Sequence, residues 1–261
     1  MLIVDTHCHA GENWYEPIEL LLYQMDANDV SKAVLVQHTG SFDNTYLLDC
    51  ARRFPGRFRV VAMVDVSQVD APSTLEGWAE QGVAGVRLSP NDRSPGTDPL
   101  VVWRKAAELG LVVSSRGDVD EFGSEGFRDL VGELPDLTIV IEHLAGAEQG
   151  ISPPYEAFRG ALELAGYPNT YIKVPGLGEI SAKPPVLRPG FRFDYTPPLI
   201  EMTLEAFGPK RMMWGSDFPP VSSREGYRNS LRGVMDHPAL GSQQDREWVM
   251  GRTATRAFGF R

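Results

Sequence analysis

Eight short apolar runs recur along the chain, separated by longer segments that mix apolar and polar residues. The runs cover residues 2–5, 33–37, 59–65, 85–88, 111–115, 138–142, 170–174 and 211–217. Within most of these runs the apolar residues are continuous and do not alternate with polar ones. This pattern is typical of strands that are buried on both faces, as in a parallel sheet. The sequence therefore predicts eight buried strands.

The segments between the runs carry the spacing and the end signals of helices. Residues 18–29 have apolar positions at helical spacing, and the segment 98–110 begins with Asp98 and Pro99 and ends with Gly110. A capping residue, a proline in the first turn and a final glycine are common helix boundaries. Helices are also predicted over 43–54, 72–81, 124–133, 153–165, 196–209, 223–236 and 244–257.

Eight strand–helix units predict an α/β fold, a single (β/α)8 TIM barrel that spans residues 1–261 as one domain. An open, doubly wound sheet is the alternative, although no strand is followed by a glycine-rich phosphate loop. The longest connection, 175–198, follows the seventh strand, is rich in proline and glycine, and contains Arg188 and Arg192. Loops of this length are usually functional or disordered. We expect it to lie over the barrel mouth and to shape specificity.

Charge and cysteine content narrow the class of partner and the compartment. The chain has 25 basic and 35 acidic side chains, a formal charge of −10. Such a chain lacks the basic face that nucleic acids and anionic membranes require. Its N-terminus lacks a basic leader, no apolar run reaches the roughly 18–20 residues of a membrane helix, and two cysteines cannot form a disulfide framework. We expect a cytoplasmic protein whose partner is a small molecule. The sequence leaves open whether the chain forms a homo-oligomer.

Histidine and acidic residues stand at the ends of three predicted strands. His7 and His9 end the first strand, Glu142 and His143 the sixth, and Asp217 the eighth. In a barrel, catalytic groups lie at the C-terminal strand ends, and the first and last strands are neighbours. Side chains two residues apart on an extended segment point the same way, and imidazole is a good zinc ligand. We therefore expect a joint site in which both imidazoles can bind one ion close to Asp217.

Several of these residues also have a structural interpretation. His143 could be a satisfied core histidine, and Asp217 could cap the turn before the prolines that follow it. His38 ends the second strand and either borders the cleft or lies at its rim. His237 is predicted to lie in an exposed loop. Residues 14–15, Trp-Tyr, either line the pocket or pack under the first helix.

Three basic residues lie on or directly after the fourth, fifth and seventh predicted strands. Arg87 ends the fourth strand, Arg116 follows the fifth, and Lys173 lies on the seventh. Guanidinium groups bind carboxylates through two parallel hydrogen bonds. We expect Arg87 and Arg116 to bind a substrate carboxylate or a polyhydroxylated ring and to act in catalysis, with Lys173 assisting substrate binding. The alternative is that these cations pair with acids such as Glu142 or Asp118.

Four segments resemble the amidohydrolase superfamily, in its amidohydrolase-related branch. They are VDTHCH (4–9), VIEHLAG (140–146), YIKVPGLGE (171–179) and RMMWGSDFP (211–219). The resemblance covers nearly the whole chain, and the last segment is specific when it is paired with the first. It implies a TIM-barrel hydrolase of the lactonase subgroup, whose members open sugar lactones and pyrone-dicarboxylate lactones. Other members of the branch decarboxylate small unsaturated acids.

By this resemblance, His7, His9 and Asp217 correspond to metal ligands, and His143 to the sixth-strand histidine. His143 is then either an additional ligand or a group that polarises the substrate, and Asp5 orients an imidazole. Many metal-bound members have a histidine at the end of the fifth strand, where this chain has none, and the carbamylated lysine of two-metal members is replaced by Arg87. We expect at most one divalent ion, zinc, or a metal-independent lactonase.

The expected reaction is the opening of a lactone, or of a related ester or amide, by an activated water. Asp217 is the candidate general base, and His143 with a neighbouring cation would polarise the carbonyl. A metal-dependent decarboxylase on the same scaffold is the first alternative. A barrel that only binds a ligand is the second, and a phosphate-binding barrel enzyme is the third.

Overall fold

The computed structural model describes residues 1–187 and 193–260. Eight parallel strands lie in the order β1 to β8 and form a nearly closed barrel. Their bounds are β1 Val4–Cys8, β2 Lys32–Val36, β3 Phe58–Ala62, β4 Gly85–Leu88, β5 Val112–Ser115, β6 Ile139–Ile141, β7 Thr170–Val174 and β8 Met212–Trp214. The predicted (β/α)8 barrel is confirmed.

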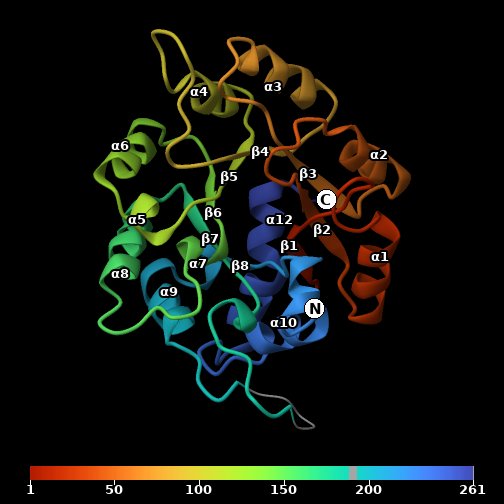
Figure 1. Ribbon diagram of the computed structural model, residues 1–261, viewed down its shortest axis with the longest axis vertical. Coiled ribbons are helices and arrows are strands. Elements are labelled where there is room, and N and C mark those ends of the chain that lie inside the picture. The colour runs from red at the N-terminus through yellow and green to blue at the C-terminus, as the bar shows by residue number, and fades with distance from the viewer. Residues whose placement is uncertain (188–192, 261) are drawn as a thin grey trace.

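Helices follow the strands and surround the barrel (Figure 1). The α-helices are α1 Ile18–Ala27, α2 Thr45–Arg53, α3 Ala71–Glu80, α4 Val101–Glu108, α5 Val119–Phe122, α6 Glu125–Glu133, α7 His143–Gly146, α8 Glu156–Leu162, α9 Leu199–Phe207, α10 Tyr227–Met235, α11 Gln243–Glu247 and α12 Thr253–Phe258. Short 3-10 turns are η1 Glu163–Gly166, η2 Leu177–Glu179, η3 Pro209–Arg211 and η4 Pro220–Ser223, and η5 Trp248–Arg252 is a π-helical turn.

The strands are buried on both faces, which explains their continuous apolar sequences. One face of the strands packs against the helices in a large apolar layer. The other face supplies a smaller cluster that includes Val34, Val61 and Met213 and contacts Ala254 and Phe258 of α12. Figure 1 shows α12 across the middle of the barrel. Both faces of the strands are therefore buried and stabilise the barrel. The ends of the strands, and not their faces, are open to a site.

The barrel closes between β8 and β1 through residues of β1 and residues just beyond the ends of the two strands. The amide of Asp217 donates to the carbonyl of His7 at 2.7 Å, and the amide of His9 donates to the carbonyl of Phe218 at 2.7 Å. Asp5, fully buried, accepts hydrogen bonds from the amide and the hydroxyl of Ser216. These bonds set the first and last strands side by side, and they place Asp217 next to the two histidines.

Several element boundaries differ from the sequence predictions. The strand that contains the apolar run 2–5 begins at Val4 and continues to Cys8. The eighth strand ends at Trp214, because the residues that follow turn into the closing contacts. The helix predicted over 223–236 begins at Tyr227. The helix predicted over 244–257 is divided into α11, η5 and α12.

The connection 175–198 divides into parts with different surroundings. Gly178 and Glu179 line the main cavity, whereas residues 180–185 line a second cavity of about 330 Å³ beside it. Arg188 and Arg192 lie outside the described residues, so their expected role in specificity stays a prediction. In the part of the chain that the structure describes, no helix has the length and apolarity needed to span a membrane.

Candidate active site

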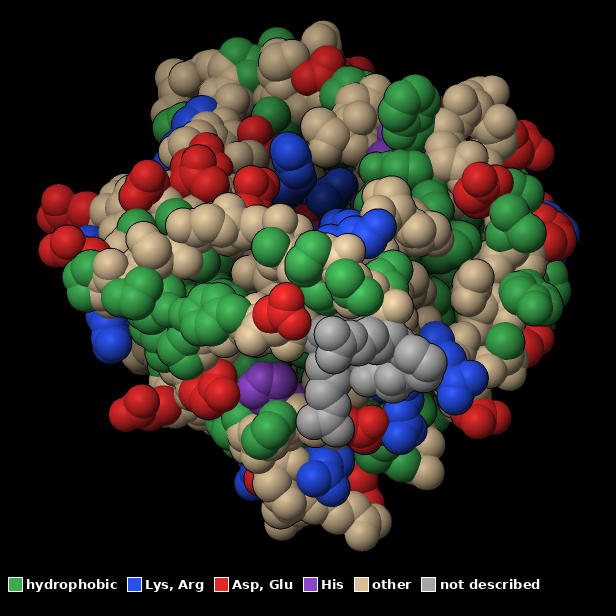
Figure 2. Space-filling view, turned by 60° about the horizontal axis from the view of Figure 1, so that its bottom comes forward, with side chains coloured by type: hydrophobic (Ala, Val, Ile, Leu, Met, Phe, Trp, Pro, Cys, Tyr) green, Lys and Arg blue, Asp and Glu red, His purple; other side chains and the backbone are tan. Residues whose placement is uncertain are grey.

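A cavity of about 850 Å³ opens at the C-terminal ends of the strands. Its wall is polar and carries both charges, and Figure 2 shows basic and acidic side chains meeting in a hollow on this face. The titratable residues and aromatic rings that line it are His9, Trp14, Tyr15, His38, Arg87, Arg116, Asp118, Glu121, Glu142, His143, Glu148, Glu179, Asp217 and Arg224. A cleft with converging polar groups is the usual form of a small-molecule site.

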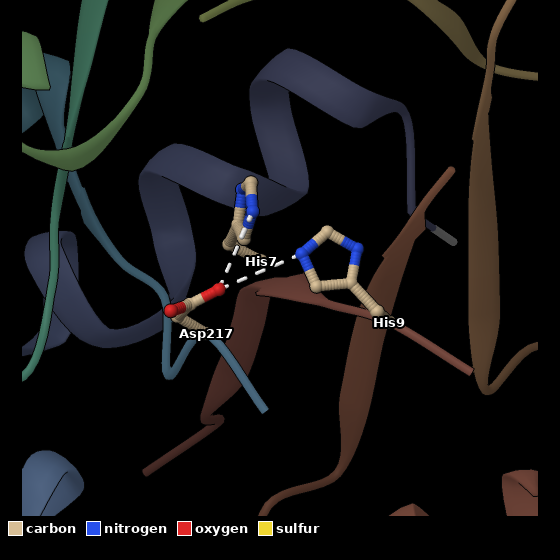
Figure 3. A group of neighbouring side chains, drawn as sticks. All are labelled: His7, His9 and Asp217. Carbon is tan, nitrogen blue, oxygen red and sulfur yellow. Dashed lines mark ion pairs between the residues drawn. The ribbon is translucent and has the colours of Figure 1, made fainter. Parts of the chain in front are cut away.

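His7, His9 and Asp217 converge at the bottom of this region, as the sequence predicts (Figure 3). Oδ1 of Asp217 lies 3.5 Å from Nε2 of His9 and 3.9 Å from Nε2 of His7. All three residues are buried, with exposed fractions of 9% or less. The three groups are therefore close enough to share one ion or one water molecule.

The backbone at two of the strand ends is unusual and aims these side chains. Asp217 has φ 59°, and His143 has φ 50°. Such left-handed conformations are uncommon for residues other than glycine, and they cluster at functional sites. The hydrogen bond from the Asp217 amide to His7 holds the first of these turns in place.

The surroundings of His9 define its tautomer. Nδ1 of His9 lies 2.7 Å from the carbonyl oxygen of Val36, and a carbonyl can only accept, so Nδ1 carries the proton. In the neutral ring, Nε2 then presents a lone pair to Oδ1 of Asp217. Burial lowers the pKa of His9 even though Asp217 opposes this effect, so the neutral ring is favoured. Two lone pairs 3.5 Å apart make a favourable position for a cation.

His7 contacts a buried lysine on its other side. Nδ1 of His7 lies 3.0 Å from Nζ of Lys173, which also donates to Ser114 at 2.8 Å. Burial and the nearby Lys173 lower the pKa of His7, and burial lowers the pKa of Lys173 to about 8. Nε2 of His7 is buried and has no hydrogen-bond partner among the described residues. This nitrogen can bind an ion when Nδ1 carries the ring proton and donates it to the amine form of Lys173.

Arg87 pairs with Glu142, which is the alternative that the sequence left open. Nη2 of Arg87 donates to Oε2 of Glu142 at 2.7 Å, and Nε contacts both carboxylate oxygens at 3.2 Å. Burial would raise the pKa of Glu142, but Arg87 and Lys173 hold it well below its usual range. Arg87 is thus held in an ion pair with Glu142, and its guanidinium also lines the cavity.

The other two predicted cations lie in different surroundings. Arg116 is exposed at the cavity, and among the described residues no acidic side chain forms an ion pair with it. Asp118, its expected alternative partner, instead caps α5 by accepting the amides of Asp120 and Glu121. Lys173 is 1% exposed and is not part of the described cavity wall, so the structure places it beneath His7 and away from the expected position for substrate binding.

Two cavity residues, Glu179 and Arg224, were missed by the sequence analysis. Oε1 of Glu179 lies 2.8 Å from Nδ1 of His143, and Nη1 of Arg224 donates to Oδ2 of Asp217 at 3.0 Å. Burial lowers the pKa of His143, but Glu179 and neighbouring acids outweigh it, so that the pKa is raised. The segment YIKVPGLGE ends on Glu179, and this was the available signal for that residue.

Four other expectations can be compared with the structure. Asp5 does not contact an imidazole: its carboxylate binds Ser216 and the hydroxyl of Tyr227, because it lies below the histidines at the barrel closure. His237 is 8% exposed, so the prediction of an exposed loop position is wrong. His38 lines the cavity, and Tyr15 stacks on His9 with ring centroids 5.0 Å apart.

Known proteins resemble this chain over most of its length. An L-fucono-1,5-lactonase from Burkholderia ambifaria is 30% identical, covering 83% of this chain and 80% of that protein. A 4-sulfomuconolactone hydrolase from Hydrogenophaga intermedia is 26% identical, covering 83% of this chain and 70% of that protein.

Solved structures share the same barrel. A protein from Pseudomonas putida, provisionally named 2-pyrone-4,6-dicarboxylic acid hydrolase, is 26% identical with a TM-score of 0.76, covering 100% of this chain and 98% of the other. An amidohydrolase from Burkholderia multivorans with bound zinc has a TM-score of 0.79 at 19% identity, over 100% of both chains. The family model described as amidohydrolase matches residues 4–260. This chain therefore belongs to the amidohydrolase family.

Proposed function

We propose that this protein hydrolyses a small lactone at the C-terminal mouth of its barrel. The observation that best supports this proposal is the convergence of His7, His9 and Asp217, with Oδ1 of Asp217 within 3.9 Å of both imidazoles. Two relatives that match 83% of this chain are named as lactone hydrolases, which supports this choice of reaction.

Asp217 is the general base of the proposed reaction. Burial would raise its pKa, but the positive charge of His143 and Arg224 is among the effects that outweigh burial, so the pKa is lowered and the carboxylate stays ionised. Arg224 engages Oδ2, which leaves Oδ1 directed at the histidines. A water held there loses its proton to Oδ1 as it attacks the lactone carbonyl carbon. The ring C–O bond then breaks, and the alkoxide oxygen takes this proton back to give the hydroxy acid.

We assign the polarisation of the lactone carbonyl to His143 and Arg87. His143 lies in the cavity wall with Nδ1 against Glu179, so its other nitrogen is free to face a substrate oxygen. Arg87 adds positive charge at the end of β4. Fixed positive groups of this kind stabilise the oxyanion that forms as water attacks.

The donor set at the bottom of the site fits one divalent ion, for which zinc is our proposal. Nε2 of His7 is buried without a partner, and Nε2 of His9 faces a carboxylate with its lone pair. His7, His9 and Asp217 would hold the ion, with His143 nearby as an additional donor. When bound, such an ion acts as a Lewis acid and lowers the pKa of a bound water toward neutrality.

Arg116 is our candidate for binding an anionic or polyhydroxylated part of the substrate. It lines the cavity, and within the described residues it has no ion-pair partner of its own. Arg87 and Arg224, in contrast, are paired with Glu142 and Asp217. A substrate carboxylate or hydroxyl cluster can thus bind Arg116 without breaking an existing ion pair.

A lactone panel tests this function directly. The purified protein is assayed by proton release on L-fucono-1,5-lactone, 4-sulfomuconolactone and 2-pyrone-4,6-dicarboxylate, and by carbon dioxide release on unsaturated carboxylic acids. We expect at least one lactone to be opened with kcat/KM of about 10⁴ M⁻¹s⁻¹ or higher. Release of carbon dioxide from an acid, with every lactone at its uncatalysed rate, would instead support the decarboxylase alternative.

A further inference from the structure

A chain of charged side chains runs along one wall of the cavity from β6 to β8. It begins at His143, whose Nδ1 lies 2.8 Å from Oε1 of Glu179. Oε2 of Glu179 lies 3.2 Å from Nη2 of Arg224, and Nη1 of Arg224 donates to Oδ2 of Asp217 at 3.0 Å. Arg224 thus bridges two carboxylates, each of which touches one of the groups that carry the proposed chemistry.

Glu179 and Arg224, the two middle residues of this series of charged side chains, are held in place by neighbouring groups. Glu225, whose side chain is 1% exposed, accepts a hydrogen bond from the amide of Gly178 at 3.1 Å and lies 3.7 Å from Nε of Arg224. A Cβ atom at Gly176 or Gly178 would come within 1.9 Å or 2.1 Å of this carboxylate. The two glycines therefore leave room for the Glu225 carboxylate to dock against their loop. This docking links the loop that carries Glu179 to the segment that carries Arg224.

We propose that Arg224 and Glu179 are positioning residues, an inference that rests on the proposed function. The guanidinium holds Oδ2 of Asp217, so Oδ1 points at His7 and His9. Glu179 holds the ring of His143 toward the cavity. Without Arg224 the Asp217 carboxylate is free to rotate about its terminal bond, and misplacement by about 1 Å can cost 10²-fold in rate.

The kinetic test compares Arg224→Met and Arg224→Lys with Arg228→Met. Arg228 is a matched control because it is exposed, four residues further on, and has no ion pair in the described chain. We expect kcat to fall about 10- to 100-fold in Arg224→Met with KM within about threefold, and Arg224→Lys to recover part of the loss. If Arg224 only made Asp217 less basic, its removal would instead raise kcat, which would overturn the proposal.

Crystal structures of the parent and of Arg224→Met give a readout that needs no substrate. We expect the Asp217 carboxylate to rotate away from His9 in the variant, and an unmoved carboxylate would overturn the proposal. This comparison holds even if the parent opens no lactone, which would refute only the proposed function. Should Arg224→Met not fold, Glu179→Gln is the test: the His143 ring is expected to shift and kcat to fall, and an unchanged ring and rate would overturn the proposal.

Discussion

Nε2 of His9 lies 3.5 Å from Oδ1 of Asp217, although the contact of its other nitrogen with Val36 leaves Nε2 without a proton in the neutral ring. Two electron-rich atoms at this distance repel each other unless a positive charge lies between them. Burial disfavours the protonated ring, because it lowers the pKa of His9. A bound cation is therefore the arrangement that fits this pair best.

The first prediction follows from this pair. Protein equilibrated with zinc and then dialysed is expected to retain about one ion per chain, the stoichiometry of a mononuclear catalytic site. His9→Ala and His7→Ala each remove a donor nitrogen, so both are expected to lose the ion. Elemental analysis measures the content, and His237→Gln, outside the cavity, serves as the control. Equal zinc in the parent and in His9→Ala would rule out this ligand set.

A second prediction concerns Arg116. Replacing it by Gln removes the cation that is free to bind an anionic group, so KM for a carboxylate-bearing lactone is expected to rise about tenfold. The value of kcat should change little, because the contact is made equally in the ground state and the transition state. Steady-state kinetics measure both constants.

Arg93→Gln is the matched control for Arg116, because Arg93 is exposed and is not part of the described cavity wall. A neutral sugar lactone provides a second control in the same assay. An unchanged KM for every charged lactone in Arg116→Gln would remove Arg116 from the binding site.

The third prediction concerns the buried pair of Arg87 and Glu142. Glu142→Gln leaves the Arg87 charge without its carboxylate, and loss of one partner of a buried pair costs about 3–5 kcal/mol of the free energy of unfolding. Urea denaturation at neutral pH measures this loss. Glu80→Gln, on an exposed position at the end of α3, should change stability little. Equal stability of the two variants would contradict the role of this pair.

The same pair makes a prediction for pH. Arg87 and Lys173 hold the pKa of Glu142 below its ordinary value of 4.5, in spite of burial. Below that pH the unfolded chain takes up a proton that the folded chain does not, so the stability contributed by Glu142 is lost as pH falls. The free energy of unfolding should therefore fall more steeply with decreasing pH in the parent than in Glu142→Gln. Parallel curves would contradict this account.

Much of the fold and part of the site can be predicted from the sequence. Continuous apolar runs identify buried parallel strands because both faces of a barrel strand are covered. The convergence of His7, His9 and Asp217 could be predicted because they lie at or just beyond the ends of β1 and β8, where barrel topology alone brings strand ends together. The closing hydrogen bond from the amide of Asp217 to the carbonyl of His7 shows why this rule works here.

Glu179 and Arg224 could not be found in this way. Glu179 lies in a 3-10 turn after β7, and Arg224 lies between η4 and α10, so neither belongs to a strand end. Their contact depends on how two loops fold over each other, which periodicity does not describe. The pairing of Arg87 with Glu142 was one of two open alternatives, because the direction of a long side chain is set by its neighbours in space.

The most direct test of the account is the turnover number of Asp217→Asn on the lactone that the parent opens best. The substitution keeps the size of the side chain and removes the base, so kcat is expected to fall about 10²–10⁴-fold. Asp129→Asn, at an exposed position of α6, is the control and should match the parent. A folded Asp217→Asn protein with kcat within a few-fold of the parent would contradict the assignment of Asp217 as the base.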